Sequence, residues 1–518
     1  MPPTRAVALL AASALALSLG SGSPGAAARA PRISAVAWDD SSPVASGSLT
    51  SARMSLVAGP GTEAKVWVTG GTLVGLPEGC APSTVLQRRS WLSDDGTTLV
   101  CDVVDEQTVD VTLTVRAGQD ASALAARVVE HDRESALPER TVLPGSPDAP
   151  RRLRLVSSPD FLNADVADLR DGPTFWNSRR SANATSPAYE RALGTVLDDW
   201  QRLQPDGVLV AGDLVNGRWG RDTHHTGNFG PVATPAQRVV ATRRAAGTYY
   251  PQYLQRFRDR GLELYPAIGD HEYGDNPWPG SKRRLAPVFK NEFARFFTRT
   301  RAGRPRFADH PAGPHAGTAY AFRPAPDVQI VSIDPFDITA AHARLGLDRA
   351  QERWLRGVLG KAQADGVRWT IVQGHLPLLE PVRARGSSEL HYPRGSRSEL
   401  WRLFRQYGVD VYLCGEVHDV TASSRDGILQ LAHGGAFQFG LTTYAVLDVY
   451  DDRLEVTLND YAVRVRDARD RSRLWETVRS GLKKLIKVDP DPVTIGTLTL
   501  DATGQLTRRT GILLPYER

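Results

Sequence analysis

Residues 268–276 read IGDHEYGDN, which places a histidine between an aspartate and a glutamate directly after the apolar run LELYPA. Carboxylates hold divalent cations in proteins, and imidazole exchanges a proton near neutral pH. The stretch could therefore be one wall of a metal-dependent hydrolytic site. Taken alone it could also be a charged surface loop, so the rest of the chain must distinguish the two.

Five segments that look like strands end in residues of this kind. They are SSPDFLN with Asp160, VAGDLVNG with Asp213, AIGDHE with Asp270 and His271, VQGHLP with His375, and LCGEVHD with Glu416 and His418. A single aspartate after a strand is more often a helix cap or a turn residue. Open α/β sheets, however, bind ligands at the carboxyl ends of their strands. Together, the five ends predict one shared site.

The strands that carry these residues alternate with amphipathic helical patterns. The helical patterns cover residues 188–203, 236–260, 348–363 and 398–407. Such alternation predicts a layered α/β domain, which we place at residues 153–460. A hairpin with its turn at Asp451 and Asp452 is expected to close this domain.

The N-terminal part of the chain has a different pattern. At residues 32–133, short alternating runs such as AKVWVTGG are separated by Gly, Pro and Asp, which predicts a small β-sandwich domain. Residues 134–152 are rich in proline and charge and indicate a linker. Residues 461–518 combine a basic helical stretch with two short strands, and no chemistry is assigned to them.

Residues 1–28 contain an arginine, an apolar stretch and then small residues, which is typical of a secretory signal peptide. We therefore expect a secreted protein, in which Cys80 and Cys101 form a disulfide and Cys414 is a buried thiol. No membrane anchor is indicated. The 63 basic and 58 acidic residues are scattered, which indicates no nucleic-acid partner. The oligomeric state is left open.

The order G-D, G-D-H-E, G-H-x-P and G-x-x-H, each after its own strand, resembles the calcineurin-like metallophosphoesterases over about residues 152–460. The resemblance implies a four-layer α/β/β/α sandwich and the hydrolysis of phosphate mono- or diesters with two divalent metal ions. Two such ions can clamp a phosphate and lower the pKa of a bridging water. With an immunoglobulin- or fibronectin-like domain in front, the arrangement is similar to that of purple acid phosphatases.

The resemblance also implies roles for individual residues. Asp213 would bridge the two metal ions. His271 would protonate the leaving oxygen as a general acid, and Glu272 would orient His271. The implied metal ligands are Asp160, Asp213 and His418 for the first ion and Asp213, Asp270, His375 and Glu416 for the second.

One departure from the family pattern concerns the opening motif. The family has D-x-H there, whereas this chain has D-F-L from Asp160 onward, so a histidine ligand is missing. An amide oxygen of Asn163 or Asn216, or a water, could take its place. The alternative function is therefore a catalytically weakened member that binds phosphorylated ligands or cell-surface polymers.

Two further departures add negative charge. Asp270 replaces the usual asparagine, and Glu416 replaces the usual first histidine of G-H-x-H. With Asp160 and Asp213 they amount to about four negative charges, which would balance two divalent cations. Oxygen-rich coordination favours manganese, iron or magnesium over zinc.

The glycine-rich loop LVNGRWGRDTHHTGNFGP follows the second strand of the α/β pattern. It could form the rim of a phosphate-ester site, or it could be a solvated loop without a function. Its candidate substrate-binding residues are Arg218, Trp219, His224 and His225.

Overall fold

The structure, a computed structural model, describes most of the chain between residues 32 and 511. The described residues are 32–39, 44–45, 47–57, 63–78, 80, 90–93, 96–102, 108–118, 122–130, 133–134, 141–143, 145–146, 150–160, 187–215, 217, 219, 229–382, 387–435, 442–461, 463–465 and 486–511. The expected signal peptide and the basic helical stretch lie outside these residues. The same holds for five candidate site residues, namely Asn163, Asn216, Arg218, His224 and His225.

The N-terminal region is all β, as predicted. One sheet has the order β1 (Arg32–Trp38), β3 (Leu49–Val57), β8 (Thr108–Ala117) and β5 (Gly71–Leu73). The other has the order β10 (Arg133–Glu134), β9 (Ser122–Glu130), β4 (Glu63–Thr69), β7 (Thr98–Asp102) and β6 (Trp91–Leu92). Alternate residues of both sheets, such as Met54 and Val66, are buried in one shared core.

The predicted disulfide between Cys80 and Cys101 is present in this core, with an S–S distance of 2.10 Å. Cys414 is a free, buried cysteine, as expected. Its thiol packs among apolar residues of the α/β region, and burial raises its pKa. The structural role predicted for Cys414 agrees with this position.

The predicted linker at residues 134–152 contains strands, which differs from the expectation. β11 (Thr141–Leu143) pairs with β9, and β12 (Gly145–Ser146) pairs with β2 (Val44–Ala45). Backbone N–H and C=O groups at the edge of a sheet favour such additions, which the composition of the segment does not reveal. Part of the predicted linker therefore belongs to the N-terminal sheets.

The α/β alternation predicted after residue 152 is also present and contains two sheets. The seven-stranded sheet has the order β15 (Leu264–Pro266), β14 (Gly207–Val210), β13 (Leu153–Ser157), β24 (Thr443–Val449), β25 (Arg453–Asp460), β28 (Val493–Asp501) and β29 (Leu506–Gly511). The six-stranded sheet has the order β16 (Tyr320–Ala325), β17 (Val328–Ser332), β20 (Trp369–Gln373), β21 (Val411–Cys414), β23 (Ile428–His433) and β22 (Val420–Arg425). Strands β13, β14 and β15 are parallel to one another, as are β17, β20, β21 and β23.

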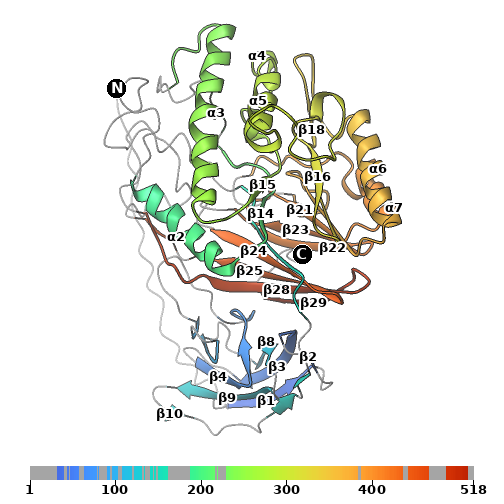
Figure 1. The fold of residues 1–518 in the computed structure, drawn as a ribbon. Helices are drawn as coiled ribbons and strands as arrows, with labels where there is room; N and C mark the ends of the chain where they lie inside the picture. Colours follow the sequence, from blue (N-terminus) through green and yellow to red (C-terminus); the bar gives the residue numbers. More distant parts are fainter. Residues whose placement is uncertain are drawn as a thin grey trace, which may run out of the picture.

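These two sheets share an apolar core. Leu155 and Leu447 contribute to it from the seven-stranded sheet, and Ile371 and Leu413 from the six-stranded sheet. Helices cover other strand residues in a second core, to which α2 (Pro187–Leu203), α3 (Pro235–Arg258), α5 (Ala286–Phe293), α6 (Arg349–Ala364) and α7 (Glu399–Tyr407) contribute. Figure 1 shows α3 to the left of the central strands and α6 and α7 to their right. The central strands are nearly continuous apolar runs because they are buried on both faces.

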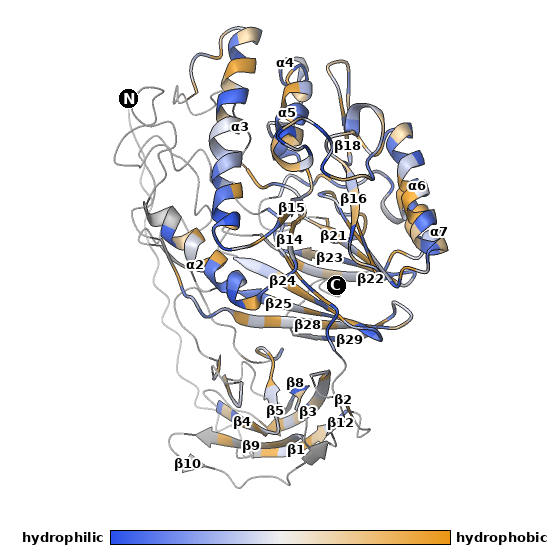
Figure 2. Ribbon diagram, viewed as in Figure 1, coloured by the Kyte–Doolittle hydropathy of each residue, from blue (hydrophilic) through white to orange (hydrophobic). Residues whose placement is uncertain are grey.

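Local capping explains where the helices begin and end. Thr234 and Gln237 form a reciprocal capping box at the start of α3. The side chains of Asp348 and Ser398 accept backbone N–H groups at the starts of α6 and α7. Gly408, with φ 65°, ends α7 in the left-handed conformation. Figure 2 shows apolar and polar residues alternating along α3 and α6, as the helical patterns predict.

The C-terminal strands extend the seven-stranded sheet, so this sheet continues past the predicted boundary at residue 460. β28 pairs with β25, and β29 pairs with β28. These strands also meet the N-terminal region, as Figure 1 shows. The Thr114 hydroxyl donates to Thr510 Oγ1 at 2.7 Å, and Arg116 forms a 3.1 Å ion pair with the buried Glu455. Among the described helices, none is both long and apolar enough to span a membrane.

Candidate metal centre

Strand ends of both sheets bring six predicted metal ligands to one place. Asp160, Asp213 and Asp270 follow β13, β14 and β15 of the seven-stranded sheet. His375 follows β20, and both Glu416 and His418 follow β21, in the six-stranded sheet. Ligand atoms of Asp160, Asp213 and His375 lie within 4.8 Å of one another, as do those of Asp270, His375 and Glu416.

His375 lies at the centre of the cluster. Its Nδ1 atom is 3.0 Å from the carbonyl oxygen of Ala211. Because a carbonyl only accepts, Nδ1 carries the proton, and the neutral ring therefore has its lone pair on Nε2. The distances from Nε2 are 3.2 Å to Asp270 Oδ1, 3.4 Å to Asp213 Oδ2, 3.6 Å to Glu416 Oε2 and 3.9 Å to Asp160 Oδ1.

Several buried ligand atoms of the cluster, among them His375 Nε2, Asp160 Oδ2 and Asp270 Oδ1, have no hydrogen-bond partner among the described residues. Buried polar atoms are nearly always satisfied, so such exceptions in one cluster require an explanation. Carboxylate oxygens and an imidazole lone pair are the atoms that coordinate divalent cations. The residues present therefore fit a metal site.

The charges of the cluster support the same conclusion. Burial, together with the neighbouring carboxylates, raises the pKa of Asp160 to about 7. Burial and Asp270 raise the pKa of Asp213 well above its usual value. Burial alone would raise the pKa of Asp270 too, but His271 and His375 in their protonated forms lower it. Divalent cations would relieve the repulsion among these buried acids.

Four of the ligand residues have a left-handed backbone conformation, which non-glycine residues rarely adopt. The φ angles are 45° at Asp160, 61° at Asp213, 64° at Glu416 and 59° at His418. The left-handed region costs a non-glycine residue on the order of 1–2 kcal/mol. Such conformations gather at functional sites, where the surrounding structure maintains them. Left-handed residues therefore stand in the turns after β13, β14 and β21, where they carry ligand side chains of the cluster.

The glycines of the motifs allow these side chains to approach one another. A Cβ atom on Gly212 would lie 2.5 Å from His375 Nδ1, and one on Gly415 would lie 2.7 Å from the same atom. A Cβ atom on Gly269 would lie 2.2 Å from Asp213 Oδ1. Only glycine permits so close an approach.

Glu272 supports the backbone of the site. Its buried carboxylate accepts the N–H groups of Gly269 at 2.7 Å, Asp213 at 3.0 Å and Val215 at 3.2 Å. It therefore joins the turn after β15 to the turn after β14. The sequence predicts a different role, in which Glu272 orients the imidazole of His271.

His271 lies at the edge of the cluster, where its side chain is 14% exposed. Its Nε2 atom is 3.7 Å from Asp213 Oδ2 and 3.9 Å from Asp275 Oδ1. Its backbone N–H donates to Asp213 Oδ1 at 3.0 Å. His271 thus faces the carboxylates from a position that solvent reaches, whereas His375 is fully buried. His418 lies on the Asp160 side, with Nε2 3.6 Å from Asp160 Oδ1.

Trp219 does not lie on a substrate rim, which corrects the sequence prediction. Its side chain is 3% exposed and packs against Tyr249, Tyr250 and Phe289, with ring centroids 6.0, 5.4 and 6.1 Å away. The aromatic residues of α3 and α5 create this environment, and a loop motif alone cannot reveal it. Trp219 therefore belongs to the apolar core.

Asn276 and Ser388 also contact the cluster, although neither was a sequence candidate. Asn276 donates to Asp270, and Ser388 donates to Glu416. Asn276 stands in the same GDHEYGDN stretch as Asp270, which is a signal that could have identified it. Ser388 lies 28 residues before Glu416, and no pattern connects the two.

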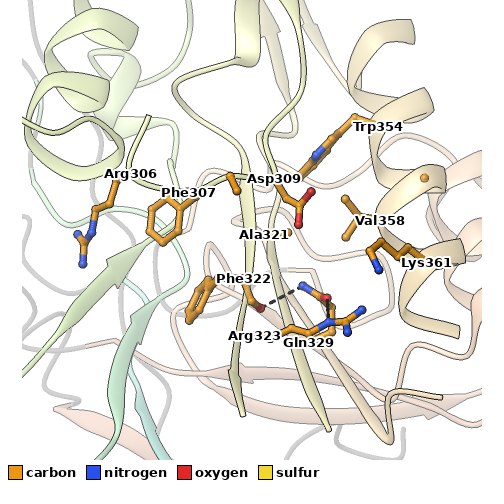
Figure 3. A pocket seen from close by; sticks show the side chains of 12 residues that line it. Arg306, Phe307, Asp309, Ala321, Phe322, Arg323, Gln329, Trp354, Val358 and Lys361 are labelled. Atoms are coloured by element: carbon orange, nitrogen blue, oxygen red, sulfur yellow. Dashed lines mark hydrogen bonds between the residues drawn. The ribbon is translucent and has the colours of Figure 1, made fainter. Parts of the chain in front are cut away.

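A separate cavity of about 670 Å³ lies between β16 and α6, lined by Phe307, Phe322 and Trp354 among others (Figure 3). Of the predicted site residues that the structure describes, none lines it. Two of its basic residues, Arg323 and Lys361, already donate to the same Asp365 carboxylate oxygen, at 2.7 and 2.6 Å. The strand ends, with their unpartnered ligand atoms, are therefore the better candidate for phosphate chemistry.

Several solved structures resemble the chain weakly, each at 10% sequence identity. The match to GAP50, the anchor in the inner membrane complex of Plasmodium, covers 60% of this chain and 85% of the GAP50 chain, with a TM-score of 0.30. The match to wild-type Vps29 complexed with zinc, from Entamoeba histolytica, covers 66% of this chain and 99% of the Vps29 chain, with a TM-score of 0.24. The match to a predicted phosphoesterase from Streptococcus pneumoniae TIGR4 covers 65% of this chain and 98% of the other chain, with a TM-score of 0.23. These values are too low to support an inference about function.

None of the curated proteins matches the chain in sequence. Residues 185–420, by contrast, match the family model of the calcineurin-like phosphoesterases. The matched segment contains Asp213, Asp270, His375, Glu416 and His418, and it begins after Asp160. The chain therefore carries a calcineurin-like phosphoesterase domain at residues 185–420.

Proposed function

We propose that the protein is a secreted, metal-dependent phosphoesterase that hydrolyses phosphate mono- or diesters at a site for two divalent cations. One observation carries the proposal. Buried carboxylates from the seven-stranded sheet lie around His375 of the six-stranded sheet, and the ligand atoms His375 Nε2, Asp160 Oδ2 and Asp270 Oδ1 have no hydrogen-bond partner among the described residues. The phosphoesterase family implies the phosphate-ester substrate.

The positions of the residues suggest how they would share the work. Asp213 lies between His375 and His271, with Oδ2 3.4 Å from the Nε2 atom of His375 and 3.7 Å from that of His271, which suits a bridging ligand. Divalent cations held there would polarise the ester and lower the pKa of an attacking water. His271, partly exposed beside Asp213, would donate a proton to the leaving oxygen.

The remaining ligands would divide between the two cations. Asp160 and His418 would complete one site, and Asp270, His375 and Glu416 the other. Four carboxylates and two imidazoles form an oxygen-rich set, which favours manganese, iron or magnesium over zinc.

We also propose how the chain is organised around this site. Residues 32–133 would form an immunoglobulin- or fibronectin-like domain, with residues 134–152 leading to the catalytic unit. The catalytic unit would be a four-layer α/β/β/α sandwich that starts at residue 153 and, with β28 and β29, extends past residue 460. Export after removal of residues 1–28 agrees with the disulfide between Cys80 and Cys101, because disulfides persist in oxidising compartments.

Metal content and hydrolysis together test the function. The purified protein is analysed for bound metal and then assayed with an aryl phosphate monoester and an aryl phosphate diester in the presence of Mn²⁺. We expect hydrolysis of at least one ester and a loss on the order of 100-fold or more in Asp213→Ala, because losing a bridging ligand removes binding to both ions. Asp451→Ala, which changes an exposed carboxylate paired with Arg152, should keep full activity.

Two results would contradict the proposal. A protein that neither contains nor binds metal, and that hydrolyses neither ester, cannot be a metal-dependent phosphoesterase. A protein that binds metal and an aryl phosphate without turning it over would instead be the catalytically weakened binding protein.

A further inference from the structure

Asp270 and Glu416, the two carboxylates that depart from the family pattern, have the same orientation. Each turns one oxygen toward the centre of the cluster, where Asp270 Oδ1 and Glu416 Oε2 lie 3.2 and 3.6 Å from His375 Nε2. Each turns its other oxygen away from the centre. The outer oxygens therefore determine how the inner oxygens face a cation.

Both outer oxygens are held by hydrogen bonds. Asp270 Oδ2 accepts the side-chain amide of Asn276 at 2.9 Å and its backbone N–H at 3.3 Å. Glu416 Oε1 accepts the Ser388 hydroxyl at 2.8 Å, the Ser388 N–H at 2.9 Å and the Leu390 N–H at 3.2 Å. These bonds leave the inner oxygen of each carboxylate as the one available for coordination.

One further hydrogen bond joins the two sets. The Asn276 amide nitrogen also donates to Ser388 Oγ, at 2.9 Å. The directions are consistent, because the amide has two N–H groups, one for Asp270 and one for Ser388. The single hydroxyl proton of Ser388 is then directed to Glu416. A flipped amide would present its carbonyl oxygen to the Asp270 carboxylate, which cannot donate.

We propose that Asn276 and Ser388 form a bridge that holds Asp270 and Glu416 in one-oxygen coordination, and that this bridge sets the affinity and selectivity of the metal site. The inference rests on the proposed function, since it concerns the same site. Residues that hold metal ligands through hydrogen bonds change metal affinity by about 10- to 100-fold when they are removed. Asn276 and Ser388 are thus positioning residues.

The bridge also has a consequence for selectivity. Ca²⁺ accepts carboxylates through two oxygens and takes six to eight ligands in flexible geometry, whereas smaller ions keep fewer and more regular contacts. Carboxylates whose outer oxygens are already bonded cannot easily bind an ion through both oxygens. The intact bridge should therefore favour Mn²⁺ over Ca²⁺, and its loss should reduce the difference.

Titration calorimetry on the full-length protein, after a chelator has removed metal, tests the bridge directly. Mn²⁺ and Ca²⁺ are titrated separately into the wild type, Ser388→Ala, Asn276→Ala and the double variant. We expect Mn²⁺ to bind on the order of 10-fold more weakly to each single variant, and little more weakly to the double variant, because the two residues act as one unit. The preference for Mn²⁺ over Ca²⁺ should fall in all three variants.

Two control variants separate positioning from folding. Ser387→Ala removes a neighbouring hydroxyl that accepts the Glu389 N–H at 3.2 Å, and it should leave Mn²⁺ affinity unchanged. Ser388→Thr keeps the hydroxyl and should restore most of the affinity lost in Ser388→Ala. The urea midpoints of the metal-free bridge variants should match that of the wild type.

Each contrary result has a distinct meaning. Wild-type Mn²⁺ affinity in both single variants would overturn the bridge and leave the proposed function intact. Additive losses in the double variant, or lower urea midpoints that account for the weaker binding, would also overturn it. A wild-type protein that binds no Mn²⁺ would overturn the bridge and the proposed two-metal site together.

Discussion

The imidazole Nδ1 of His375 donates a hydrogen bond to the carbonyl oxygen of Ala211 at 3.0 Å. His375 follows β20 of the six-stranded sheet, and Ala211 follows β14 of the seven-stranded sheet. This bond joins the two halves of the candidate metal centre and fixes the ring so that Nε2 faces the carboxylates. The relative position of the two sheets therefore determines the geometry of the site.

Gly212→Ala should disrupt this contact. The new methyl group would lie 2.5 Å from His375 Nδ1, at a position with φ 90°. We expect the free energy of unfolding to fall by about 2–4 kcal/mol, from backbone strain and overpacking together. Urea unfolding of the metal-free protein measures this. Gly247→Ala is the control, because its Cβ meets nothing within 4 Å in the middle of α3, and it should be neutral or stabilising. Equal stability of the two variants would contradict the packing described here.

Asp213→Asn should separate stability from metal binding. Burial and Asp270 raise the pKa of Asp213, which means that its charge is costly without a cation. The asparagine keeps an oxygen for the His271 N–H. We therefore expect the metal-free variant to be more stable than the wild type at pH 7, by about 1–3 kcal/mol. Added Mn²⁺ should raise the thermal midpoint of the wild type and not that of the variant. A variant that is less stable without metal would contradict the electrostatic account.

Glu416→His should shift the choice of metal toward zinc. The change replaces a carboxylate by an imidazole beside His375, so that the cation proposed there would have two imidazole ligands. It also removes the acceptor of the Ser388 hydroxyl. The ratio of the Zn²⁺ and Mn²⁺ dissociation constants should change by about 10-fold or more in favour of zinc. Competition between the two ions, followed by metal analysis of the protein, measures the ratio. An unchanged ratio would show that Glu416 is not a ligand.

His271→Gln should lower turnover and spare metal binding. His271 lies at the partly exposed edge of the cluster, where a proton donor would reach a leaving oxygen. We expect kcat to fall by about 100- to 10,000-fold, with a larger loss for alkyl than for aryl esters because poorer leaving groups depend more on protonation. Steady-state kinetics and Mn²⁺ titration are compared in the same variant. The control is His310→Gln, because the wild-type His310 ring contacts the carbonyl oxygen of the neighbouring Pro311. A variant with lost Mn²⁺ affinity and unchanged kcat would contradict the acid role.

Asp410→Asn should change how stability depends on pH. Burial raises the pKa of Asp410 from about 3.8 to about 6, against the opposing effect of the Thr370 N–H. The folded protein therefore binds this proton more tightly than the unfolded chain, and the contribution of Asp410 to stability falls as the pH rises from about 4 to 6. Asparagine cannot ionise, so the variant should gain on the order of 2 kcal/mol of unfolding free energy relative to the wild type between pH 4 and pH 7.

Urea unfolding at both pH values measures the gain, and the exposed Asp451→Asn serves as control. A constant difference between variant and wild type would contradict the buried charge.

Much of the fold could be predicted because its signals are local. The runs before Asp160, Asp213 and Asp270 became β13, β14 and β15, since apolar residues of strand length indicate buried strands wherever they occur. The helical patterns became α2, α3, α6 and α7 for the same reason. The pairing of β28 and β29 with the seven-stranded sheet was not predictable, because sheet edges meet through contacts between residues far apart in sequence.

The candidate site divides in the same way. The glycine, aspartate and histidine motifs predicted which side chains would gather, and the structure brings Asp213, Asp270 and His375 together. Motifs could not place Trp219, which packs under α3 and α5, or reveal Ser388 as a partner of Glu416. Both depend on which distant surfaces meet.

The sequence by itself determined the strands that precede the site residues, four of the helices between them, and the residue types at the strand ends. Hydrophobic periodicity and turn chemistry act over a few residues, so they can be recognised without a fold. Only the tertiary structure decided which oxygen of each carboxylate faces His375 and which faces the bridge of Asn276 and Ser388. These orientations arise from hydrogen bonds across two sheets, and such bonds exist only once the sheets have packed together.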